Sequence, residues 1–214
     1  WSTPGAPISA MVGISGSTAS RLPLLTASMR RVPARWCDIT VSGLVKPTDL
    51  KGIKLRVPEG KWRVKMFQAY GANPSPMKFS ELFTALQTGV MDGQENPFTQ
   101  IYSAKLQEVQ KYLSLSGHVY TPAYLTVGSK KWNELPADVR KVLADTAKET
   151  QAWVYTTAEK EDNELLAKLK TGGIQVNTPN KDAFVAASKP VYDEFAKEVP
   201  IAKDVIDRAI ALGK

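Results

Sequence analysis

The sequence is poor in the residues that build metal and redox sites. Among 214 residues there is one cysteine, Cys37, and one histidine, His118. A single cysteine excludes an intrachain disulfide and a thiolate metal cluster, and it leaves the redox compartment undecided. A single histidine argues against a zinc site and against a histidine base. We therefore expect a protein without a bound metal or cofactor.

Other common signatures are absent as well. No apolar run approaches the roughly 18 residues of a membrane-spanning helix. The sequence contains neither GxGxxG nor GxxxxGK[ST], and no GxSxG motif accompanies His118. Glu81 and Glu95 could form a hydrolytic carboxylate pair, but an acid at position 81 is also favoured by the dipole of the helix predicted there. No enzyme class is indicated.

The net charge of +7 at first suggests an anionic partner. Residues 1–37 hold four arginines and no acid, and the other 177 residues hold 24 basic and 21 acidic groups, a net of +3 (24 − 21). In that larger part lysines and acids alternate, and no basic run is interleaved with aromatics. Nucleic acid is therefore not an expected partner.

The N-terminal segment differs from the rest of the chain. Residues 1–35 are rich in Ser, Thr, Ala, Gly and Pro and show no sustained periodicity. Arg-rich, acid-poor stretches of this kind also occur as organellar targeting segments, whereas the apolar stretch of a secretory signal is not found here. We divide the chain into an atypical segment, residues 1–45, either disordered or foreign to the natural fold, and an α/β region, residues 46–214.

A strand is the first regular element of that region. Apolar and basic residues alternate within LKGIKLRVPEG, in the order Ile53, Lys54, Leu55, Arg56 and Val57. This period of two predicts a half-buried strand over 53–57, which Pro58 ends. Arg56 then lies on the polar face at the carboxyl end of the strand.

Helices and strands alternate over the remaining chain. The pattern predicts helices over 61–71, 80–88, 97–109, 136–170, 180–198 and 201–213, and strands over 112–116, 123–128 and 173–179. The helix over 136–170 would be about 50 Å long, more than the width of one lobe. The alternation indicates α/β architecture.

Local signals mark the ends of these helices. Gly71 is the expected C-cap of the first helix, and Ser80 and Gly89 bound the second. MDGQENP reads as a tight turn in which Asn96 is an N-cap and Pro97 the first helical residue. Pro190 is expected to interrupt the helix over 180–198.

Three residues have ordinary explanations when each is taken alone. Arg56 fits a solvated strand arginine, and Phe79 fits a hydrophobic staple before the Ser80 cap. Asn96 is explained by its capping role. Taken together with their spacing, the segments around them carry a more specific signal.

Four segments share a pattern with one protein family. They are PTDLKG at residues 47–52, KLRVP at 54–58, PMKFSELFTALQTGVMDGQENP at 76–97 and WNELP at 132–136. In these segments, and over about residues 45–212, the chain resembles the solute-binding proteins of TRAP transporters, the dicarboxylate-binding DctP type. The resemblance implies a periplasmic-binding-protein-like α/β fold, type II-like, with a two-lobed cleft and a long connecting helix. It also implies a chain that lacks most of the N-terminal lobe.

The resemblance implies a set of ligand-binding residues. Arg56 would clamp a ligand carboxylate, Phe79 would line the cleft, and Asn96 would contact the ligand. Arg35, 21 residues before Arg56, is the candidate for a second cleft arginine. Guanidinium suits the first role because it matches a carboxylate with two parallel hydrogen bonds and stays charged.

The implied function is capture of a small organic acid in the periplasm and its delivery to the membrane permease, with no covalent chemistry. A homodimer is left open. The alternatives are a stand-alone ligand sensor or interaction module, a remnant that binds nothing, and, more distantly, an acid/base hydrolase.

Overall fold

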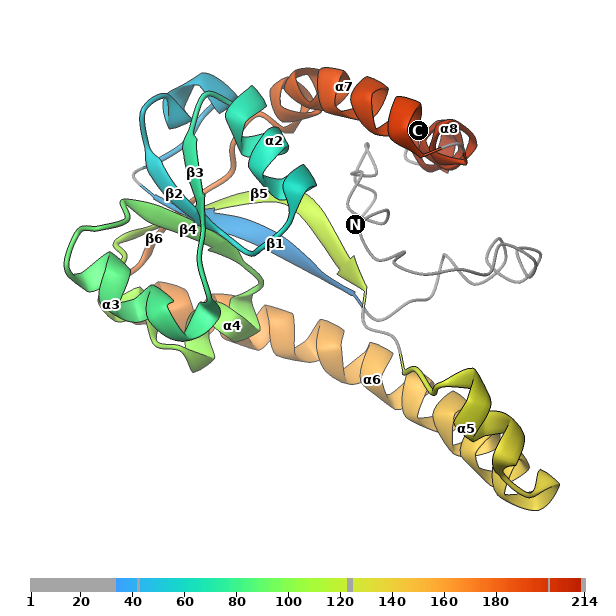
Figure 1. The fold of residues 1–214 in the computed structure, drawn as a ribbon. Coiled ribbons are helices and arrows are strands. Elements are labelled where there is room, and N and C mark those ends of the chain that lie inside the picture. The colour runs from blue at the N-terminus through green and yellow to red at the C-terminus, as the bar shows by residue number, and fades with distance from the viewer. Residues whose placement is uncertain (1–33, 42, 123–124, 200, 213–214) are drawn as a thin grey trace.

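The computed structural model describes residues 34–41, 43–122, 125–199 and 201–212 (Figure 1). Six strands form one mixed sheet in the order β3-β2-β4-β1-β5-β6. The strands are β1 (Ala34–Thr40), β2 (Lys54–Val57), β3 (Asn73–Pro76), β4 (Gly93–Asn96), β5 (Tyr112–Pro122) and β6 (Gln175–Asn177). Strand β1 runs antiparallel to both its neighbours, whereas β2 is parallel to β3 and β4, and β5 is parallel to β6.

Helices cover both faces of this sheet. The α-helices are α2 (Lys61–Ala69), α3 (Leu82–Gln87), α4 (Phe98–Ser103), α5 (Ser129–Glu134), α6 (Ala137–Thr171), α7 (Lys181–Glu198) and α8 (Ala202–Leu212). Short 3₁₀ turns occupy Pro47–Leu50, Phe79–Glu81 and Leu106–Glu108. Helices α2 and α7 lie on one face, and α3, α4 and the last turns of α6 lie on the other (Figure 1). Both faces of β4 and β1 are therefore enclosed.

Each face has its own apolar core. Under α2 and α7, buried side chains of β1 and β2 pack on Phe67, Tyr70 and Phe184. Under α3, α4 and α6, Leu113 of β5 packs with Leu82 and Leu169. The two cores explain why apolar residues occur on both sides of the sheet.

The predicted long helix is confirmed as α6, Ala137–Thr171. Its first half lies beyond the sheet, where α5 precedes it, and its last turns reach α4 (Figure 1). Leu169, at that last end, is its buried residue. Within the described residues, none of the helices is both long and apolar enough to cross a membrane.

Glycine ends α2 as the sequence predicts. Gly71 has φ of 90°, and its N–H donates to the Gln68 carbonyl at 2.9 Å. The next N–H, of Ala72, donates to the Phe67 carbonyl at 3.0 Å. This pair of bonds is a Schellman motif, which requires the left-handed backbone that glycine adopts at least cost.

The segment GQEN is a central strand and not the predicted tight turn. Gly93–Asn96 forms β4, which pairs with β2 on one side and β1 on the other. Gly93 makes this pairing close, because a Cβ there would lie 2.4 Å from the Thr40 carbonyl oxygen. Pro97 is consequently the N-cap of α4, which ends at Ser103, so the expected helix from Pro97 to about residue 109 is wrong in both start and length.

Three other local predictions are corrected. Ser80 lies inside a 3₁₀ turn, and Glu81, not Ser80, is the N-cap of α3. Helix α7 continues through Pro190, because its buried side chains Tyr192 and Phe195 hold the turns beyond the proline in place. The second strand expected over 123–128 is not formed by residues 125–128, and Leu125 is 85% exposed. Positions 123 and 124 lie outside the described residues.

The boundary expected at residue 45 does not match the sheet. Strand β1 begins at Ala34 and lies between β4 and β5, so the regular fold starts well before residue 46. Val41 and Leu44 are buried in the core under α2 and α7. The sequence pattern missed β1 because its Arg, Asp and Thr residues obscure the alternation. The prediction for residues 1–33 lies outside the described residues.

Candidate functional site

Polar side chains from three adjacent strands share one face of the sheet. Arg56 of β2 stands in register with Gln94 of β4, and Gln94 stands opposite Thr40 of β1. Asn96 of β4 stands opposite Asp38 of β1. Because side chains alternate along a strand and paired residues share a face, these five form one polar group, which we call the polar face.

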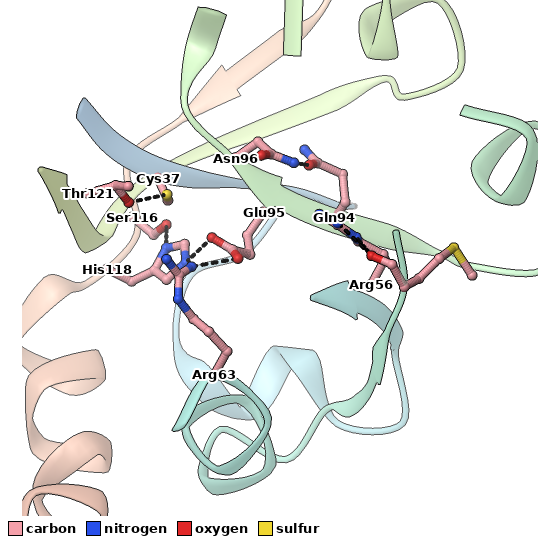
Figure 2. Close-up of polar contacts among 10 residues, drawn as sticks. Cys37, Arg56, Arg63, Gln94, Glu95, Asn96, Ser116, His118 and Thr121 are labelled. Atoms are coloured by element: carbon pink, nitrogen blue, oxygen red, sulfur yellow. Dashed lines mark hydrogen bonds and ion pairs between the residues drawn. The ribbon is translucent and has the colours of Figure 1, made fainter. Parts of the chain in front are cut away.

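Arg56 is buried in this group rather than solvated, with 3% of its surface exposed. Its Nε and Nη2 atoms both donate to the Met77 carbonyl, at 2.9 and 2.6 Å (Figure 2). The guanidinium lies 5.9 Å from the centre of the Phe79 ring, within the range of a cation–π contact. Burial lowers the pKa of Arg56, although a guanidinium remains charged.

No acidic side chain among the described residues forms an ion pair with Arg56. Glu95 favours the charged form of Arg56 without forming an ion pair with it, and burial penalises that form more strongly. Two of its five N–H groups are used by Met77. The remaining donors can serve an anion.

Gln94 connects the members of the polar face. Its Nε2 donates to Thr40 Oγ1 at 3.0 Å. Its Oε1 accepts from Asn96 Nδ2 (Figure 2). Gln94 is fully buried, whereas Asn96 is half-buried. The amide of Gln94 thus fixes the orientation of Asn96.

The opposite face of β4 carries a separate ionic cluster around Glu95 (Figure 2). Glu95 Oε1 accepts from Arg63 Nη1 at 2.6 Å, and Glu95 Oε2 lies 3.2 Å from His118 Nε2. His118 Nδ1 lies 2.8 Å from Ser116 Oγ. Because a carboxylate only accepts, we assign the ring proton to Nε2, and Ser116 then donates to Nδ1.

The charges in this cluster follow from that arrangement. Burial alone would raise the pKa of Glu95, but the Arg63 guanidinium and the hydrogen bond from His118 outweigh it and hold the pKa below its ordinary value. Burial lowers the pKa of His118, so the imidazole is neutral. The cluster therefore holds one cation and one anion. Because Glu95 is already paired with Arg63, the hypothesis that it forms a hydrolytic carboxylate pair with Glu81 is disfavoured.

Cys37 lies on the same side as this cluster and is inert by its surroundings. Its Sγ is 3.4 Å from Thr121 Oγ1, and burial raises the pKa of the thiol to about 12. A thiol with so high a pKa is a poor nucleophile and metal ligand.

The structure brings together three of the four residues expected to bind ligand. Arg56 and Asn96 share the polar face through Gln94, and Phe79, 42% exposed, flanks Arg56. Arg35 stands opposite Thr121 in β1, outside the Asp38–Thr40 segment that pairs with β4. Its backbone lies in the same strand as Asp38 of the polar face, three residues before it.

Sequence reasoning missed Asp38, Thr40 and Gln94. Two of them lie in β1, which was not predicted as a strand, and Gln94 was placed in a turn. Polar residues alternate in DIT (38–40) and in GQEN (93–96), and this pattern was the sequence signal for them. It indicates a shared polar face only when the two segments are known to pair.

Comparison with known proteins identifies the family. Residues 38–198 match the family described as bacterial extracellular solute-binding protein, family 7 (DctP). The 2,3-diketo-L-gulonate-binding periplasmic protein of Escherichia coli is 34% identical over 175 residues, which are 80% of this chain and 53% of that protein.

Solved structures agree. A TRAP periplasmic solute-binding protein from Haemophilus influenzae with bound L-gulonate has a TM-score of 0.78 at 36% identity, covering 86% of this chain and 61% of that one. One from Shewanella oneidensis with bound succinate has a TM-score of 0.75 at 34% identity, covering 84% and 60%. The chain spans about half the length of the relatives it matches by sequence. It belongs to the DctP family of bacterial extracellular solute-binding proteins and has their fold over the matched region.

Proposed function

We propose that this chain is the solute-binding subunit of a TRAP-type transporter, working in the periplasm. It captures a small organic acid and delivers it to the membrane permease without covalent chemistry. One observation carries the proposal: Arg56 is a buried cation on the polar face, with no acidic partner among the described residues. Relatives that bind L-gulonate and succinate support an acid as the ligand.

In this proposal each residue has a role in binding. Arg56 forms two parallel hydrogen bonds with the ligand carboxylate and stays charged while doing so. Asn96, oriented by Gln94, hydrogen-bonds to the ligand, and Phe79 supplies apolar wall area beside the guanidinium. Arg35, in the same strand as Asp38, remains a proposed second cleft arginine.

The test is calorimetric titration of the chain with mono- and dicarboxylates. Arg56→Ala should weaken binding by about 30-fold to several thousand-fold, because loss of a desolvated carboxylate–Arg pair costs about 2–5 kcal/mol. Arg56→Lys should recover part of the affinity, since it keeps the charge but loses the fork of donors.

Lys54→Ala is the matched control. Lys54 lies two residues earlier on the same strand but is exposed and paired with Asp92. Acid binding that survives Arg56→Ala, or that is lost equally in Lys54→Ala, would refute the role of Arg56. Absence of binding by any acid would favour a remnant that binds nothing.

A further inference from the structure

The first half of α6 carries a row of uncharged side chains along one side. Positions 139, 143, 146, 150, 153 and 157 recur at alternating intervals of four and three residues, which places them on one side of a helix, and position 142 adjoins them. We call this set the α6 stripe, and its members are Val139, Val142, Leu143, Thr146, Thr150, Trp153 and Thr157.

The α6 stripe is open to solvent. Val142 is 64% exposed, Leu143 is 46% exposed and Trp153 is 65% exposed. This half of the helix lies beyond the sheet (Figure 1), and its charged residues lie off the stripe. A helix that separates apolar from charged residues in this way packs its apolar side on another part of a protein. The stripe therefore indicates a docking surface.

One border of the stripe is acidic. Asp138 and Glu149 lie about three turns apart on the same side of the helix. Neither forms an ion pair within the described part of the chain, whereas Asp145, between them, is paired with Lys141 at 2.6 Å. A partner that carries basic residues beside an apolar run would complement both the stripe and this border.

The N-terminal segment of the same chain has that composition. RLPLLTASMRRV, residues 21–32, holds three arginines, and residues 1–33 contain no acid. Its large apolar residues are Leu22, Leu24, Leu25, Met29 and Val32.

The segment also joins the fold close to α6. It leads into Ala34 of β1, which pairs with Pro122 at the end of β5. The paired ends of β1 and β5 point toward α5 and the first half of α6 (Figure 1). The stripe is about 27 Å long, and the 13 residues from position 21 to position 34 reach about 45 Å when extended. The segment is long enough to follow the whole stripe.

A second copy of the chain fits the stripe less well. Contact between two such stripes would bury about 600 Å² in total, less than the roughly 1,000 Å² of a specific interface. In the antiparallel register that sets Leu143 against Trp153, Glu149 would face Glu149 of the second copy. A tethered segment needs less contact area, because its effective concentration is about millimolar.

We propose that the α6 stripe is a docking surface for residues 21–32 of the same chain. The apolar residues of the segment cover Leu143 and Trp153, and its arginines lie beside Asp138 and Glu149. This contact is independent of the ligand proposed above, and it gives the first half of α6 a partner that the sheet does not supply.

The test is the rate at which iodoacetamide alkylates a cysteine placed on the stripe of the 214-residue chain, followed by mass spectrometry. Cys37 gives little background, because it is buried and the pKa of its thiol is raised to about 12. Thr150→Cys should react at least about tenfold more slowly than the same variant with Leu24→Ser and Leu25→Ser added. That protection corresponds to a segment at about 1 mM effective concentration and a local affinity of about 0.1 mM.

Lys148→Cys is the matched control, since position 148 is exposed on the side of α6 opposite the stripe. Its alkylation rate should change by less than about twofold when the two leucine substitutions are added. The inference is overturned if those substitutions leave the rate of Thr150→Cys unchanged, or if they raise both rates equally. Protection of Thr150→Cys that grows with protein concentration would show a second copy on the stripe and would also overturn it.

Discussion

The ion pair between Arg63 and Glu95 offers the sharpest test of how the sheet is held behind the polar face. Only 1% of the Glu95 side chain and 14% of the Arg63 side chain are exposed. Glu95→Gln leaves Arg63 buried without its anion. Because an uncompensated buried charge costs about 3–5 kcal/mol, we expect a loss of that size in the free energy of unfolding.

Urea unfolding followed by circular dichroism measures the loss. For a slope of about 2 kcal/mol per molar urea, the midpoint should fall by about 1.5–2.5 M. The pKa of Glu95 is lowered in the folded state, so its contribution is present above the ordinary glutamate pKa and disappears as pH falls through the folded-state value. The difference between the two proteins should thus be full at pH 7 and shrink in acid.

Two further variants make the reasoning refutable. Glu134→Gln removes an exposed pair with Lys131, whose side chains are 48% and 82% exposed, and should cost less than about 1 kcal/mol. The double variant Arg63→Met with Glu95→Gln removes both buried charges and should be more stable than Glu95→Gln alone. A midpoint for Glu95→Gln no lower than that of Glu134→Gln, or strictly additive losses in the double variant, would contradict a buried pair.

Two other predictions concern β4 and β1. Gly93→Ala should destabilise the fold by several kcal/mol, because the new Cβ would lie 2.4 Å from the Thr40 carbonyl oxygen. The control Gly128→Ala has open space around the new Cβ and should change the thermal midpoint little. Equal thermal midpoints for the two variants would argue against the close approach of β4 to β1. Burial raises the folded-state pKa of Asp38 to about 7. Ionisation of Asp38 should therefore lower the free energy of unfolding by at most about 4 kcal/mol as pH rises from about 4 to 7. Lys181, Asp162 and Glu95 are the charged groups that also act on it. Asp38→Asn should therefore become more stable, relative to the unaltered chain, as pH rises over that range. Urea unfolding at several pH values measures the difference in unfolding free energy between the two proteins. A difference that does not change with pH would refute the raised pKa of Asp38.

The comparison of sequence with structure separates two kinds of site residue. The alternation placed Arg56 on the polar side of a strand, two residues before Pro58, and the family resemblance implied its ligand role. Taken alone it fitted a solvated arginine, but it is buried, since the residues that enclose it come from other parts of the chain. Asp38, Thr40 and Gln94 gave no such local signal, because each lies in a short polar strand whose burial depends on its neighbours.

By itself, the sequence determined the local elements with strong periodicity or chain-ending glycines. The strand before Pro58, the helix ended by Gly71 and the long helix α6 follow from interactions between residues close together in the chain. The family also follows from short contiguous segments. What only the tertiary structure decided is the pairing of GQEN with β2 and β1. That pairing separates Gln94 and Asn96 from Glu95, sending the amides to the polar face and the carboxylate to Arg63 and His118. It could not be read from the sequence because strand register is set by contacts between residues 38 or more positions apart.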